Sequence, residues 1–148
     1  MNDFYLILTS VLGAVGLSFV LKLDFRRIPT AALGSIIACG VFVWCFGVGG
    51  GLFVSSFVAA AVVSVFSEIS ARVLKAPVTV FLTPSLIPLV PGSYLYYTMY
   101  SIIERDFEGF VKNAINTIII GFGVSVGVML AAVGAKLFFS LVKKHKRK

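Results

Sequence analysis

The sequence predicts an all-α protein, a polytopic transmembrane helical bundle of about five spans whose fourth span is broken by prolines. Hydrophobic residues make up 59% of the chain, charged residues only 13%, and the mean hydropathy is +1.03. A surface in contact with water does not tolerate that composition, so lipid is the expected solvent. The 148 residues supply roughly five helices of about twenty residues and leave almost nothing for a soluble domain.

The charged residues delimit the spans. A charge at the centre of a span costs at least ~2.5–3.5 kcal/mol on insertion scales, so the gaps between charges are candidate spans. The first hydrophobic stretch is expected to be retained, because no positively charged signal-peptide region precedes it. One membrane domain over residues 1–148 is therefore predicted, with spans at about 4–21, 30–46, 52–74, 78–103 and 113–141 and a basic tail at 142–148.

Prolines break the first half of the predicted fourth span. No regular helix is expected before Gly92, and Pro84 and Pro91 are predicted to start helical pieces. Irregular backbone inside a membrane must be buried in protein or line a polar cavity. Such a break places free N–H groups and a positive helix end where secondary transporters hold carboxylates. A proline-kinked packing helix remains the alternative.

The distribution of Lys and Arg predicts the orientation. The basic residues at 22–27, at 72–75 and in the tail are expected in the cytoplasm, with the glycine turn at 47–51 and the acidic turn at 104–108 outside. The amino terminus is then outside and the carboxyl terminus cytoplasmic. If the proline segment were a re-entrant loop, the chain would have four spans and its tail would face outward. Residues 104–112 are expected to lay an apolar face on the membrane surface.

A motif between the third and fourth spans resembles a known signature. The residues that carry it are Ala71-Arg72, Lys75, Ala76-Pro77, Thr79, Phe81-Leu82, Pro84 and Ile87-Pro88-Leu89-Val90-Pro91-Gly92. They resemble the carboxyl-terminal half of the threonine/serine exporter family, which occurs fused behind a larger membrane domain or as a separate small subunit. The length of this chain looks like the separate form. The resemblance implies proton-driven export of threonine and serine, or of dicarboxylates such as succinate, across the cell inner membrane with a larger partner subunit.

Candidate pathway residues follow from the break and the resemblance. They are Arg72, Lys75, Thr79, Pro84, Ser85, Pro88, Pro91 and Gly92. Arg72 and Lys75, three residues apart, are predicted to share a helix face and attract a substrate carboxylate, although both also serve as topology markers. Glu68 is expected to pair with Arg72 at i, i+4, and a proton-carrying role for Glu68 is a hypothesis. The hydroxyls of Thr79, Thr83 and Ser85 either line a polar path or bond backbone carbonyls.

Small and aromatic residues predict contacts with other helices and with lipid. Gly123 and Gly127 form a small-xxx-small pair, so the last span is expected to pack closely against another helix, which the sequence does not identify. Four tyrosines between 94 and 100 are expected to anchor at the headgroups. The basic tail, with His145, suits anionic lipid. An oligomer is possible.

The residue inventory excludes several functions. The sequence contains no nucleotide-binding loop, so ATP-driven transport by this chain alone is excluded. One histidine and six acidic residues assemble no catalytic or metal-ligating arrangement, so no enzyme activity, cofactor, metal or nucleic-acid partner is expected. Cys39 and Cys45 are interpreted as packing residues. Two alternatives to an exporter subunit stay open: a homo-oligomeric channel or carrier, and a structural membrane subunit that docks a partner at the proline segment.

Overall fold

The chain is helical throughout the part that the structure describes. We analysed a computed structural model that describes the backbone of residues 3–145 and the side chains of residues 8–135 and 137. No strand occurs within 3–145, so the all-α prediction is confirmed. The elements are α1 (Asp3–Val20), α2 (Ile28–Gly47), α3 (Gly51–Val73), α4 (Thr79–Ser85), the 3₁₀ turn η1 (Ile87–Leu89), α5 (Gly92–Ile103) and α6 (Phe107–His145).

Helix length and composition fit a membrane protein. Within the described residues, the three helical stretches Ile28–Gly47, Gly51–Val73 and Phe107–Ala135 are long and apolar enough to span a bilayer, and Leu8–Val20 is a shorter apolar helix. Helices α1, α2 and α3 begin and end within a few residues of the predicted first, second and third spans, whereas α6 begins at Phe107, ahead of the predicted fifth span at 113–141. The division at charged residues therefore located the first three helices. The total of five spans stays a prediction.

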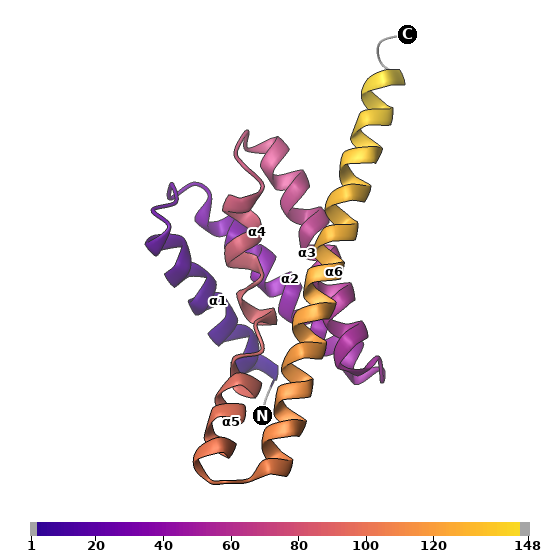
Figure 1. Cartoon of the computed structure of the whole chain (residues 1–148). Helices are drawn as coiled ribbons and strands as arrows, with labels where there is room; N and C mark the ends of the chain where they lie inside the picture. The colour runs from indigo at the N-terminus through magenta and orange to yellow at the C-terminus, as the bar shows by residue number, and fades with distance from the viewer. Residues whose placement is uncertain (1–2, 146–148) are drawn as a thin grey trace.

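The loops gather at two ends of the bundle (Figure 1). The α1–α2 loop, the α3–α4 loop and the end of α6 lie at one end, whereas the α2–α3 turn and the α5–α6 turn lie at the other. This grouping matches the one on which the orientation prediction rests. The broken segment runs from the first end to the second without doubling back. Orientation in a membrane remains a prediction, and residues 146–148 of the basic tail lie outside the described residues.

Small side chains fill most of the core. Fully buried residues include Ala31, Ala38, Ala59 and Ala60. Among the residues with described side chains, ten polar residues are also buried, nine of them serines and the tenth Glu68. Small residues let helix backbones approach closely, which substitutes for the hydrophobic effect in lipid. Several serines donate to carbonyl oxygens one turn earlier: Ser55 to Gly51 and Ser56 to Leu52 are two examples.

The predicted glycine pair lies in the contact between α6 and α3 of the same chain. A methyl group at Gly123 would lie 2.9 Å from the carbonyl oxygen of Phe53, and one at Gly127 would lie 2.5 Å from that of Phe57. The helix packed against these two glycines, which the sequence did not identify, is α3. Because contacts advance along α3 as they advance along α6, the two helices are parallel.

Four helices end in the same backbone turn. At the ends of α1, α2, α3 and α5, the amide two residues beyond the C-cap donates to a carbonyl in the last turn, as in the pair Ala76 to Ala71 at 2.9 Å. The residue in the left-handed conformation is Gly49 after α2, but after α1, α3 and α5 it is Lys22, Lys75 and Arg105, with φ of 52°, 49° and 58°. Cations near helix carboxyl ends are favourable, although the conformation itself favours glycine.

Two local predictions were wrong. Pro84 does not start a helical piece: a regular helix exists before Gly92, and Pro84 lies one residue before the end of α4. A proline removes one hydrogen bond, to the carbonyl four residues earlier, and α4 forms without it. Lys75 does not share a helix face with Arg72, because α3 ends at Val73. Residues 107–112 form the first turns of α6, which Asp106 caps by accepting from the Gly109 amide at 3.0 Å, and their contact with the membrane surface stays a prediction.

Candidate functional site

The broken segment lies at the centre of the bundle. Both α4 and η1 contact α1, α2 and α3, whereas α5 packs against α6 (Figure 1). Phe81 is fully buried and Leu89 is 3% exposed. The first part of the interrupted segment is therefore packed inside the bundle, whereas Val90, Gly92 and Ser93 at the break itself are exposed. Pro88 lies in the first turn of η1, and Pro91 is the N-cap of α5, so these two prolines start the pieces.

Ser85 fixes α4 against α2. Its hydroxyl lies 2.7 Å from the carbonyl oxygen of Phe81 and 3.2 Å from that of Ala31, so it has two acceptors within reach. A side chain at Gly34 would occupy the position of this hydroxyl. Ser85 thus serves the backbone, which is the second of its two predicted roles. Thr79 and Thr83 are exposed on α4.

A small pocket opens where the segment breaks. Its volume is about 150 Å³. The predicted pathway residues Pro88, Pro91 and Gly92 line it together with Ser93 and Tyr94, and α2 and α6 close it with Phe42 and Ile120. The amino-terminal end of α5, where a helix carries positive partial charge, begins at this pocket. The remaining lining is apolar.

Glu68 and Arg72 form the predicted ion pair on α3. Arg72 Nη2 lies 3.5 Å from Glu68 Oε2, and the side chain of Glu68 is only 9% exposed, compared with 47% for Arg72. A carboxylate buried to this degree needs a partner, and Arg72 provides one from the more exposed side. Neither residue lines the pocket at the break.

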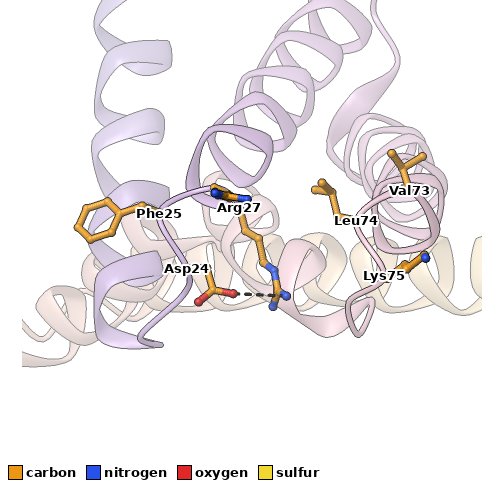
Figure 2. Close-up of a pocket in the computed structure, with 7 residues that line it drawn as sticks. Asp24, Phe25, Arg27, Val73, Leu74 and Lys75 are labelled. Atoms are coloured by element: carbon orange, nitrogen blue, oxygen red, sulfur yellow. Dashed lines mark ion pairs between the residues drawn. The ribbon is translucent and has the colours of Figure 1, made fainter.

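A second, larger pocket lies at the end of the bundle that carries the α1–α2 and α3–α4 loops (Figure 2). Its volume is about 640 Å³, and it is lined by Asp24, Phe25, Arg26, Arg27, Val73, Leu74 and Lys75. Arg27 Nη2 pairs with Asp24 Oδ2 at 3.3 Å. With three cations and one anion among its lining residues, the pocket is suited to negatively charged groups.

The predicted pathway residues thus divide among four places. Pro88, Pro91 and Gly92 meet at the break, and Thr79, Pro84 and Ser85 follow one another on α4. Arg72 stays with Glu68 on α3, and Lys75 lies in the pocket at the end of the bundle.

Sequence reasoning missed several residues of these sites. Arg26 and Arg27 were interpreted only as topology markers, and Phe42 and Ile120 were not singled out. Each reaches its pocket through a long-range contact, for which one sequence carries no signal. The hydroxyl of Ser67 in α3 was also missed: it is fully buried and has no hydrogen-bond partner in the described structure.

The described residues contain no group of three or more His, Cys, Asp or Glu side chains placed to hold a metal ion, and Cys39 and Cys45 are free thiols.

In comparisons with known proteins, the family model described as "Threonine/Serine exporter, ThrE" matches residues 6–133. That range covers most of α1, all of α2 to α5 and most of α6. No curated protein and no solved structure matches the chain.

Proposed function

Because the chain belongs to the threonine/serine exporter family, we propose that it is the small subunit of a secondary transporter that exports threonine and serine or a dicarboxylate such as succinate. The proposed transporter is proton-coupled, lies in the cell inner membrane with the carboxyl terminus of this chain in the cytoplasm, and includes a larger partner subunit. The chain itself is not an enzyme in this proposal.

The helix break beside a pocket is the observation that carries the proposal. In a continuous helix the backbone N–H and C=O groups bond one another, so none is available to bind a solute inside a bilayer. Here η1, the extended residue Val90 and the start of α5 interrupt that pattern beside a pocket. The positive end of α5 is attractive for a carboxylate, and free backbone groups at a break can exchange partners as a solute passes.

The lining of the break pocket supports a second subunit. Ser93 and Tyr94 bring the polar side chains, and the other lining residues are Gly, Pro or apolar. An amino acid or a dicarboxylate carries at least two charged groups, and each one loses its hydration unless it finds partners. The helix end can serve one group. The second requires polar groups from another chain, which we assign to the larger subunit.

Glu68 is the proposed proton carrier. Its carboxyl group is nearly buried, and Arg72 is its ion-pair partner. A buried carboxylate that alternates between an arginine and a proton is a common element of proton-coupled transporters. In this proposal, protonation of Glu68 releases Arg72, and deprotonation restores the pair.

Transport in reconstituted vesicles tests the proposal. Vesicles that contain this chain, its larger partner or both are loaded with labelled threonine, serine or succinate, and efflux is followed with and without a proton gradient. We expect gradient-driven efflux only with both subunits, abolished by a protonophore. Efflux with this chain alone would favour the self-sufficient carrier, and no efflux of any of the three solutes would refute the substrate assignment.

A further inference from the structure

The pocket at the end of the bundle joins two loops that are far apart in the sequence. Residues 24–27 connect α1 to α2, and residues 73–75 end α3, yet both line one hollow of about 640 Å³. Small-molecule sites commonly have a volume of about 300–1,000 Å³. Basic residues can hold a loop on the cytoplasmic side of a membrane without lining a pocket, because solvated loops do so equally well. A topological role alone therefore does not explain why these two loops line one pocket.

The lining supplies the groups that hold an oxyanion. Arg27 presents a planar guanidinium, which matches the two oxygens of a carboxylate or two oxygens of a phosphate. Arg26 and Lys75 add two further cations, and both are exposed and therefore within reach of a solute. Phe25, Val73 and Leu74 contribute the apolar part of the lining.

A carboxylate already lies on this guanidinium. Asp24 Oδ2 is 3.3 Å from Arg27 Nη2, and the Asp24 side chain is 68% exposed (Figure 2). Exposed ion pairs of this kind are weak, because water competes for both partners. An incoming oxyanion that also reaches a second cation can therefore displace Asp24. The carboxylate of Asp24 acts as an internal competitor for the site.

We propose that this pocket is an oxyanion-binding site in which Arg26, Arg27 and Lys75 hold a carboxylate or phosphate group in place of Asp24. Two sources share this chemistry: the carboxylate of a dissolved solute and the phosphate of an anionic lipid headgroup. The solute source rests on the proposed export function, in which the pocket collects substrate at the cytoplasmic end. The lipid source does not depend on that function.

Lys22 and Lys75, both in the left-handed backbone conformation, provide a matched pair of variants. Lys75→Gly removes a cation from the pocket and relieves a backbone conformation that favours glycine, so its melting temperature should not fall. Lys22→Gly makes the same change at the same kind of turn and at the same end of the bundle, but Lys22 is not among the lining residues. A difference between them therefore reports on the pocket rather than on folding or overall charge.

The binding test uses the full chain in nanodiscs. The probe for the solute source is labelled succinate, measured at low salt in zwitterionic phosphatidylcholine. The probe for the lipid source is phosphatidylglycerol, scored by its retention on the purified chain in native mass spectrometry. We expect Lys75→Gly and Arg27→Gln to weaken binding about three- to tenfold, in proportion to one lost charge-assisted contact. Lys22→Gly should bind like the wild type.

Asp24→Asn gives the opposite expectation. Removing the competing carboxylate should tighten binding about threefold, a gain that misfolding cannot produce. Glu104→Gln removes an acidic charge at the other end of the bundle and is its control. Succinate binding with this pattern supports the site with a solute ligand, and lipid retention alone with this pattern supports it with a headgroup ligand.

Two results would overturn the site: binding of neither probe, or equal losses in Lys22→Gly and Lys75→Gly. Its fate is separable from that of the proposed function. Efflux that is unaffected by Lys75→Gly would leave an exporter in which this pocket has no role for the solute, whereas binding without efflux would leave the site without an exporter.

Discussion

The hydroxyl of Ser85 lies against the backbone of Gly34, so the broken segment contacts α2 at a point where no side chain fits. Phe66 of α3 closes the same point, since a methyl group at Gly34 would lie 3.3 Å from its ring. Three helices therefore meet at one glycine. This junction holds α4, the first piece of the broken segment, against α2 and α3.

We expect Gly34→Ala to destabilise the chain by about 1–3 kcal/mol, because the added methyl group displaces Ser85. The measurement is reversible unfolding of the purified protein in detergent. Gly40→Ala is the matched control in the same helix, since a methyl group there meets nothing within 4 Å. Equal stability of the two variants would contradict the close contact.

Gly127→Ala should separate α6 from α3. The methyl group would lie 2.5 Å from a carbonyl oxygen of α3, a contact that only a shift of the helix relieves, so we expect a loss of about 1–3 kcal/mol in the same assay. Gly121→Ala, in the same helix and with open space around it, is expected to have no effect. Should Gly127→Ala match that control, the parallel packing of α3 and α6 would be wrong.

Much of the fold was predictable because the signals for it are local. Charges at span ends placed the first three spans within a few residues of α1, α2 and α3, and the spacing of Gly123 and Gly127 predicted a tight helix contact. The identity of the partner helix was not predictable, since Phe53 and Phe57 are about seventy residues away in the sequence. The same holds for the two loops that form the larger pocket.

The errors near the break concern the position of a residue relative to a helix end. A proline removes the hydrogen bond to the carbonyl four residues earlier, so it favours a helix start without forbidding a place near a helix end. Pro88 and Pro91 lie at helix starts, whereas Pro84 lies near the end of α4. α3 ends before Lys75, and Pro77 disfavours a helical conformation at Ala76. The turn that ends α3 has Lys75 in the left-handed backbone conformation. Glycine is the residue that usually takes this position, so the sequence carries no glycine to indicate the helix end.

Removing the unpartnered hydroxyl of α3 should stabilise the protein. Ser67 Oγ is buried without a hydrogen-bond partner, so Ser67→Ala is expected to raise the free energy of unfolding by about 1 kcal/mol. Ser85→Ala, which removes a hydroxyl that has two carbonyl oxygens within hydrogen-bond reach, should lower the free energy of unfolding. A loss of stability in Ser67→Ala would show that the hydroxyl has a partner in the membrane.

Glu68→Gln should uncouple transport from the proton gradient. The amide keeps the shape of the side chain but cannot carry the proton, so we expect efflux from the two-subunit vesicles to become independent of the gradient. Glu108→Gln, an exposed acidic residue in the first turn of α6, is the control and should behave like the wild type. Wild-type coupling in Glu68→Gln would end the assignment of Glu68 as the proton carrier.

Solute protection of a cysteine at the helix break tests the central claim most directly. In the two-subunit complex, with Cys39 and Cys45 replaced, Ser93→Cys places a thiol in the break pocket, and Ile118→Cys places one on the outer face of α6, 69% exposed and outside that pocket. If the break is the transport path, a water-soluble thiol reagent should label residue 93 and not residue 118, and the transported solute should slow that labelling. Labelling of residue 93 that no transported solute affects, or no labelling there during active efflux, would contradict the account.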